Sequence, residues 1–356
     1  MQWQRRAVRH HWCSWLLATL CVPALAAQPQ APADFAACRV LEAPLERLDC
    51  YDTVAGREQA APRAMENADV AVAVEVDEAA EDTGREPNHQ PSLVARNWQL
   101  VAQADRGPFV ITPYRPIYFL PLSYNFRSTF DEYEAAYEDV ELQRTELKFQ
   151  LSLKAKLWPD LLSDRGDLWF GYTQQSYWQA YNTDESSPFR DTNYEPELIY
   201  AWRTGYALPG LDSRLLLLGL NHQSNGQGDP LSRSWNRLIL GALFDRGPNF
   251  ATQLRLWWRI AEGEEDDNPD ITDYVGRGDW LNTYRRGRNT YSVLLRSNID
   301  PGDLRGAVRL DWAFPLGPVS PVRGYAQYFY GYGDTLLDYD QVSNRIGIGI
   351  LLTDWL

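Results

Sequence analysis

Residues 97–356 alternate between apolar and polar side chains with a period of two, in many separate stretches. Such alternation predicts β-strands, because successive side chains of a strand point to opposite faces. In residues 147–158, Leu, Phe and Ala occupy one face while Lys, Gln and Ser occupy the other. Residues 250–261 and 305–314 repeat the pattern, and segments rich in Gly, Pro and Asp separate the stretches. The sequence therefore predicts an all-β, antiparallel domain.

A soluble β-sandwich and a transmembrane β-barrel both alternate in this way. The exposed face of a sandwich rarely carries so many Lys, Arg and Gln in every strand, whereas a barrel turns its apolar face to lipid and its polar face to the lumen. Aromatic residues make up 13% of the chain, and no stretch reaches the roughly 20 apolar residues of a spanning helix. We therefore expect a barrel, and about 10 residues per strand predict about 12 strands.

The N-terminus is typical of an export signal. Residues 1–26 begin with a basic segment, continue with an apolar one, and end in Ala-Leu-Ala, a small-x-small cleavage pattern. We expect cleavage before Ala27, which would remove Cys13 and Cys21. A membrane anchor is the alternative, and the shortness of the apolar segment disfavours it.

Two further regions precede the barrel. In residues 27–62 apolar positions have helical spacing around Cys38 and Cys50, and an even pair of cysteines in an oxidising compartment predicts a disulfide. We expect a small helical segment closed by that bond. Residues 63–96, rich in Ala, Glu, Asp and Pro, are typical of a flexible acidic linker. The barrel is then expected to occupy 97–356.

The chain is acidic. Its net charge is −14, and loss of the three arginines of the signal takes it to −17. This charge argues against binding to nucleic acid. It is compatible with binding divalent cations without requiring it.

One predicted hairpin carries candidate chemistry. His222 and Ser224 continue the apolar face of Leu216, Leu218 and Leu220, so they are expected on the outer wall at the rim. The returning strand can bring Asn236 beside His222. A hydroxyl, an imidazole and an amide in a row suit acyl transfer, with Ser224 as nucleophile, His222 as base and Asn236 as its orienter.

An amide adds no negative charge to stabilise an imidazolium, so a divalent cation near the oxyanion would compensate. The segment GQGDPLS, residues 226–232, offers oxygen ligands of the type that Ca²⁺ prefers. Because Ser and His two residues apart also occur by chance, ordinary polar rim residues are the alternative.

Several segments resemble the outer-membrane phospholipase A family. The strongest is NHQSNGQGDPLSRSWNR, residues 221–237, which is similar to the active-site segment of that family. Further similar segments occur in the same order as in the family: YTQQSYWQ, SSPFRDTNYEPEL, DDNPDITDY, YGYGDTLLDY and IGIGILLTD. The resemblance covers about residues 97–356 and leaves out the two N-terminal regions.

The resemblance implies a twelve-stranded barrel in the outer membrane of a Gram-negative-type cell. It implies hydrolysis of the sn-1 and sn-2 acyl esters of glycerophospholipids and of lysophospholipids, dependent on calcium and on homodimerisation. Carried over by position, Ser224, His222 and Asn236 form the triad, and the Gly226 N–H donates to the oxyanion.

For calcium, the resemblance implies the Ser232 hydroxyl and the Gln227 carbonyl as ligands, with Ser186 contributed by a second copy. Family members commonly carry Arg where Gln227 stands; a main-chain ligand tolerates this change, while any role of the Arg side chain is lost. Gln174 shares a face with lipid-facing residues, where an amide without partners is costly. The resemblance suggests that it pairs with its mate across a dimer interface; hydration near the rim is the alternative. Tyr194 matches a residue of the substrate cleft, or belongs to the aromatic girdle.

Two other functions stay open from the sequence. A passive channel would carry the same polar lumen and only incidental polar residues at its rim. A soluble exported serine esterase would need no detergent for extraction.

Overall fold

The structure is a computed structural model that describes residues 38, 91–127, 130–137, 140–263 and 266–354. The residues from 91 onwards lie in one compact unit, 74–356, and Cys38 lies in the other. Cys38 is disulfide-bonded, but Cys50 is outside the described residues, so the Cys38–Cys50 pairing stays a prediction. The expected signal (1–26), helical segment (27–62) and most of the linker (63–96) also fall outside the described residues.

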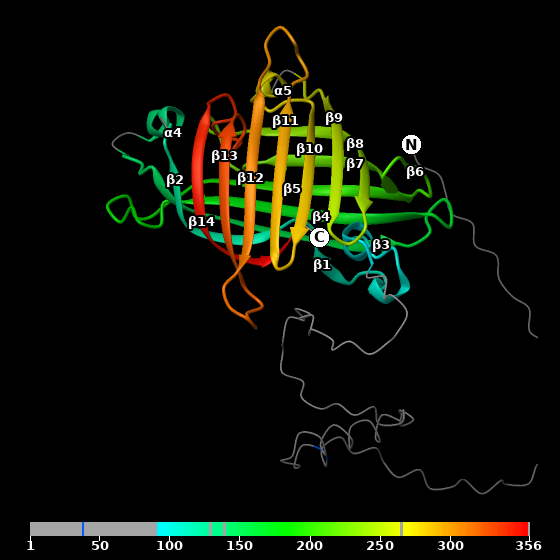
Figure 1. The fold of residues 1–356 in the computed structure, drawn as a ribbon. Helices are drawn as coiled ribbons and strands as arrows, with labels where there is room; N and C mark the ends of the chain where they lie inside the picture. Colours follow the sequence, from blue (N-terminus) through cyan, green and yellow to red (C-terminus); the bar gives the residue numbers. More distant parts are fainter. Residues whose placement is uncertain (1–37, 39–90, 128–129, 138–139, 264–265, 355–356) are drawn as a thin grey trace, which may run out of the picture. The chain divides into compact units, whose positions relative to one another are not determined.

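The unit consists of strands and a few short helices (Figure 1). In chain order the elements are α3 (Leu93–Asn97), η1 (Ala102–Ala104), β1 (Ile111–Pro113), β2 (Ile117–Asn125), α4 (Asp131–Ala136), β3 (Thr145–Trp158), β4 (Gly166–Trp178), β5 (Phe189–Arg203), β6 (Ala207–Leu208), β7 (Leu211–Ser224), β8 (Ser234–Arg246), β9 (Phe250–Ile260), α5 (Ile271–Tyr274), β10 (Gly278–Arg286), β11 (Asn289–Ser297), β12 (Gly306–Pro315), β13 (Arg323–Gly331) and β14 (Ser343–Thr353).

The long strands close into a twelve-stranded antiparallel barrel. Each pairs with its neighbour in sequence, apart from the two-residue β6, which adds to the edge of β7, and the short β1, which pairs with β3. The last strand, β14, pairs with the first long strand, β2, and β3 pairs with both β2 and β4. The predicted fold is confirmed.

The two faces of the wall have opposite character. On β7 and β8, Leu218, Leu220 and Leu240 point outward and are 51%, 52% and 45% exposed. On β3, Lys148 and Lys154 point inward and are almost completely buried. This distribution is inverted relative to a soluble sandwich and matches a barrel whose outer face meets lipid. Among the described residues, no helix is long and apolar enough to cross a membrane.

Ion pairs fill the lumen. Arg115 contacts Glu195 at 2.6 Å and Glu197 at 3.0 Å, and Arg255 contacts Asp279 at 2.6 Å. Buried charges are tolerated only when they are paired and hydrogen-bonded. Most of the inward-facing charges are therefore neutralised within the lumen.

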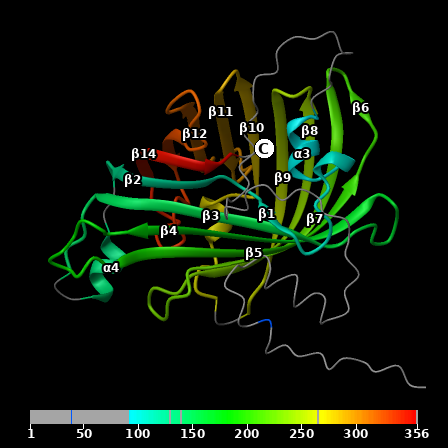
Figure 2. The ribbon, with the colours of Figure 1, turned by 90° about the horizontal axis from the view of Figure 1, so that it is seen from below.

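Helix α3 packs inside one end of the barrel, beside β8 and β9 (Figure 2). Leu93, Val94 and Trp98 are buried against inward-facing residues near the start of β7 and the end of β8. Lys154 Nζ lies 3.8 Å from the Trp98 ring centroid, a cation–π contact. Residues 91–96, expected to belong to the linker, are therefore part of the barrel unit. Their few apolar residues were too short a run to reveal this from the sequence.

The other end of the barrel is covered by chain from two loops. Ile271 and Val275, in and next to α5, pack with Leu336 and Tyr339 from the β13–β14 loop and with Trp235 at the start of β8. Ser224 ends β7 at this same end. The loops that cover the lumen therefore also surround the candidate hairpin.

Candidate active site on the outer wall

The β7–β8 hairpin aligns the candidate residues. In the antiparallel register His222 is opposite Asn236, and Ser224 is opposite Ser234. His222, Ser224 and Asn236 are all half-buried. They share the outward face of Leu218 and Leu220, because side chains two residues apart lie on the same side of a strand. The candidate residues therefore stand on the outer wall, at the end of the apolar stripe.

Asn236 contacts the imidazole of His222. The Asn236 Oδ1 atom lies 2.9 Å from His222 Nδ1. An amide oxygen only accepts hydrogen bonds, so this contact requires the proton on Nδ1 and leaves Nε2 unprotonated in the neutral ring. Ser224 Oγ makes no hydrogen bond with His222 within the described part of the chain. Such contacts often tighten only when substrate binds.

Glu262 stands on the far side of Asn236. Asn236 Nδ2 donates to Glu262 Oε1 at 2.7 Å. Glu262 could not be identified from the sequence, because it lies in an irregular acidic loop after β9, where no periodicity assigns the direction of a side chain. In the structure, the pairing of Ile260 with Asn236 brings the start of this loop beside the site.

The loop after Ser224, residues 225–233, is organised by Asn225. This buried side chain accepts from the Arg233 N–H at 3.0 Å and donates to the Leu231 carbonyl at 2.7 Å. Gly226 has φ +67°, and a Cβ atom there would lie 3.1 Å from the Tyr194 ring. Glycine at this position therefore meets both a left-handed backbone and a close neighbour.

The expected calcium ligands are only partly gathered. Ser232 Oγ donates to Asp267 Oδ2 at 2.5 Å, while the Gln227 side chain donates to the Arg190 carbonyl at 3.1 Å. Ser186 is exposed in the β4–β5 loop, with φ +58°. No cluster of three or more His, Cys, Asp or Glu suited to a metal occurs in the described part of the chain. A cation here would depend on hydroxyl and carbonyl oxygens besides a carboxylate.

The candidate triad residues form an outward-facing row on β7 and β8, called the outer row below. Gln174 on β4 and Tyr194 on β5 extend it across two further strands. Gln174 is in register with Tyr194, and Tyr194 is in register with Ser224. The Gln174 amide accepts from the Tyr172 hydroxyl at 3.1 Å and donates to Ser176 Oγ at 3.3 Å. Partners within the chain thus relieve the cost of the amide, an arrangement that neither of our expectations included.

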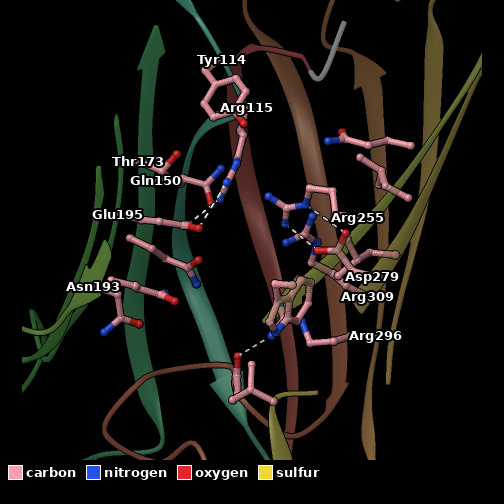
Figure 3. Close-up of a pocket in the computed structure, with 18 of the residues that line it drawn as sticks. Tyr114, Arg115, Gln150, Thr173, Asn193, Glu195, Arg255, Asp279, Arg296 and Arg309 are labelled. Atoms are coloured by element: carbon pink, nitrogen blue, oxygen red, sulfur yellow. Dashed lines mark hydrogen bonds and ion pairs between the residues drawn. The ribbon is translucent and has the colours of Figure 1, made fainter. Parts of the chain in front are cut away.

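The opposite face of the same wall lines a cavity of about 120 Å³ in the lumen. Figure 3 shows Arg115 reaching toward Glu195 on one side of it, with Arg255 beside Asp279 on the other. Glu195 and Gln223 line this cavity and are the sequence neighbours of Tyr194, His222 and Ser224. The candidate chemistry and the cavity are therefore on opposite sides of one sheet.

Helix α4, in the connection between β2 and β3, contacts the active-site loop. Arg233 forms an ion pair with Glu132 of α4. Burial raises the pKa of Glu132, and the Arg233 charge opposes that rise. Arg233 also donates to the Pro230 and Ser232 carbonyls at 3.0 and 2.7 Å. One guanidinium therefore joins α4 to the loop that follows the nucleophile candidate.

Comparison with known proteins identifies the family of the chain. The family model described as phospholipase A1 matches residues 94–352. Phospholipase A1 of Escherichia coli K12 is 37% identical over 280 residues, covering 78% of this chain and 93% of the relative. Phospholipase A1 of Klebsiella pneumoniae is 39% identical over 250 residues, covering 70% and 84%.

Two solved structures are also similar. The outer membrane phospholipase dimer of Salmonella typhi with bound calcium has a TM-score of 0.66 at 35% identity, covering 74% of this chain and 98% of that one. An active-site mutant of E. coli outer membrane phospholipase A, with Asn replaced by Ala, has the same TM-score, identity and coverage. The chain thus belongs to the phospholipase A1 family and is an enzyme of the outer membrane.

Proposed function

We propose that this protein is a calcium-dependent phospholipase that hydrolyses sn-1 and sn-2 acyl esters of glycerophospholipids and lysophospholipids. Ser224, His222 and Asn236 form its triad on the lipid-facing wall. The observation that carries the proposal is the 2.9 Å contact between Asn236 Oδ1 and His222 Nδ1 at the end of an exposed leucine stripe.

In the first half of the reaction, Ser224 Oγ attacks the ester carbonyl and His222 Nε2 takes its proton. Asn236 holds the ring in the required tautomer. The imidazolium then protonates the leaving glycerol oxygen, and an acyl-enzyme forms. In the second half, His222 activates a water that releases the fatty acid and restores Ser224.

The oxyanion requires hydrogen-bond donors and positive charge. The Gly226 N–H lies two residues after the nucleophile, in a left-handed turn held by Asn225, and is the proposed donor. The potential metal-ligand atoms around Ser232 are oxygens, which fits a hard cation such as calcium. Calcium, when bound, would stabilise negative charge developing on the substrate.

Three residues of the loops are proposed to hold that ion. They are Ser232 through its hydroxyl, Gln227 through its carbonyl, and Ser186 of the partner subunit. Because the ligand bond at Gln227 comes from the main chain, Gln in place of the usual Arg does not prevent it. The Gln227 amide instead fastens the loop to β5 through the Arg190 carbonyl.

A homodimer is the proposed active form. The strand register is continuous from Gln174 through Tyr194 to Ser224. A second copy packed against β4 and β5 would therefore contact the surface next to the nucleophile. Tyr194 is 37% exposed and would line the acyl-chain groove between subunits. Activity would then follow subunit association, which keeps an enzyme embedded in its substrate idle when alone.

Ser224→Ala tests the catalytic proposal. The substitution is expected to abolish fatty-acid release from phospholipid micelles while the barrel stays folded in detergent, since a half-buried rim hydroxyl contributes little to packing. Retained hydrolysis would contradict the assignment. Wild-type protein that conducts ions and hydrolyses nothing would instead support the passive channel.

A further inference from the structure

Glu262 hydrogen-bonds to Asn236 and so adds a fourth residue to the series Ser224, His222 and Asn236. Its Oε1 atom accepts from Asn236 Nδ2 at 2.7 Å, and Asn236 Oδ1 in turn contacts His222 Nδ1 at 2.9 Å. We propose that Glu262 is a positioning residue for the hydrolysis: it fixes the orientation of the Asn236 amide and supplies the negative charge that an amide lacks. This inference rests on the proposed function of the same site.

Donor and acceptor chemistry fixes the orientation of the Asn236 amide. An asparagine side chain can exchange its oxygen and nitrogen by a half-turn, and only one orientation presents Oδ1 to His222. A carboxylate only accepts hydrogen bonds, so Glu262 requires the Nδ2 end of Asn236. The opposite orientation would place two acceptors in contact. Glu262 therefore selects the orientation that holds His222 as a base at Nε2.

The charge of Glu262 acts on the imidazolium that forms during the reaction. In a Ser-His-Asp triad the carboxylate touches the imidazole directly and stabilises its positive charge. Here a carboxylate acts through one amide, and hydrogen bonds in a chain polarise one another. Bonds to a charged group also contribute more than neutral ones. Glu262 thus restores part of the electrostatic stabilisation that Asn in the third position forgoes.

Contacts other than its own hold Glu262 in place. The loop that follows β9 is fastened to the hairpin where Ser234 N–H donates to Asn268 Oδ1 at 2.9 Å, and to β9 itself where Arg259 pairs with Asp266 at 2.5 Å. These anchors do not involve the Glu262 side chain. Substitutions of Glu262 are therefore expected to leave the loop and the barrel folded.

Two variants separate charge from hydrogen bonding. Glu262→Gln keeps an acceptor but removes the charge, and is expected to lower kcat about fivefold with KM unchanged. Glu262→Ala removes both and is expected to lower kcat about thirtyfold. Asp273→Asn is the matched control, because Asp273 is an exposed residue after the same loop whose carboxylate lies 3.8 Å from Arg277. Its kcat is expected to equal that of the wild type.

In the Asn236→Asp variant, Glu262→Gln is expected to raise kcat instead of lowering it, and this reversal makes the test specific. In Asn236→Asp the new carboxylate faces Glu262, and the repulsion lowers kcat. Adding Glu262→Gln removes that repulsion and supplies a donor, so the double variant is expected to exceed the Asn236→Asp single variant about tenfold. A residue that merely stabilised the loop would lower activity in both backgrounds.

The outcomes distinguish this inference from the proposed function. If Ser224→Ala is inactive but both Glu262 variants match the wild type, the triad stands and the role of Glu262 is overturned. That role is also overturned if Glu262→Gln changes kcat in the same direction in both backgrounds. If Ser224→Ala retains activity, the proposed function itself fails.

Discussion

Glu195 Oε1 and Arg237 Nη2 lie 3.0 Å apart on the lumen face of the wall, directly behind the outer row. Each follows a residue of that row in sequence, Tyr194 and Asn236 respectively. Both side chains are nearly buried, and Arg237 also donates to Asn221 at 2.9 Å. Because adjacent residues share a backbone, this inner ion pair fixes the strands that carry the outer site.

Removing one partner of the inner pair is expected to destabilise the barrel. Arg237→Ala leaves Glu195 with only part of its compensation, and an uncompensated buried charge costs about 3–5 kcal/mol. We expect a lower Tm in detergent, measured by the heat-dependent shift of the folded band on a gel. Arg246→Ala, at the exposed end of the same strand, is the matched control. An unchanged Tm for Arg237→Ala would show that the lumen network tolerates the loss.

Asn236→Ala should impair catalysis without affecting substrate binding. The side chain touches His222, so its loss frees the imidazole to adopt the other tautomer. Loss of one such hydrogen bond corresponds to about 1–3 kcal/mol, or about 5- to 150-fold in kcat. Steady-state kinetics with a soluble lysophospholipid would measure kcat and KM separately. A large rise in KM with unchanged kcat would contradict an orienting role.

Calcium dependence should reside partly in Ser232. Chelation of divalent ions is expected to abolish hydrolysis, and calcium should restore it. Ser232→Ala removes one proposed ligand and should raise the calcium concentration for half-maximal activity about tenfold, by analogy with the loss of a coordinating contact. Ser213→Ala provides a serine control, because Ser213 lies on β7 at the end opposite to Ser224. Equal calcium titrations for Ser232→Ala and the wild type would remove Ser232 from the ligand set.

Dimer formation should depend on Gln174, at the β4 end of the outer row. Replacing Gln174 with Arg places a charge on the outer wall beside Tyr194, and like charges from two copies would face each other across the proposed interface. Chemical crosslinking in detergent with calcium is expected to yield less dimer than the wild type. Leu310→Arg, on the exposed face of the distant strand β12, controls for the added charge. Equal loss of dimer in both variants would argue against this interface.

The contact between Asp105, in the segment before β1, and Lys156 on β3 should depend on pH. The Gly107 N–H and the Lys156 ammonium lower the pKa of Asp105, to which they lie 3.0 and 3.1 Å away. A carboxyl whose pKa is lowered on folding stabilises the folded state at higher pH and loses this contribution as pH falls through the folded pKa. Asp105→Asn is therefore expected to lower Tm slightly at neutral pH. The difference from the wild type should shrink as the pH falls below the usual pKa of Asp.

The fold was predictable because its signal is local. Each strand is specified by alternation within about 10 residues, so residues such as Leu218 and Lys148 could be assigned to opposite faces without knowing their partners. The pairing of His222 with Asn236 was also within reach, since one hairpin with a nine-residue loop joins them. Helix α3 was not, because the residues that bury it include Leu215, Leu217 and Leu243, which lie more than a hundred positions later in the chain.

The lumen network and Glu262 were equally hidden, for a related reason. Arg115 and Glu197 are 82 positions apart, and their contact exists only once the barrel has closed with its register fixed. Glu262 lies in irregular chain, where no period fixes the direction of a side chain.

The amino-acid order thus determined the faces of the strands, the barrel and the hydroxyl–imidazole–amide row, because these depend on neighbours along one or two strands. Closure of the barrel decided which charges neutralise each other in the lumen, how its ends are covered and which carboxylate meets Asn236. Those contacts join segments that are distant in the chain, and three-dimensional packing alone brings them within bonding distance.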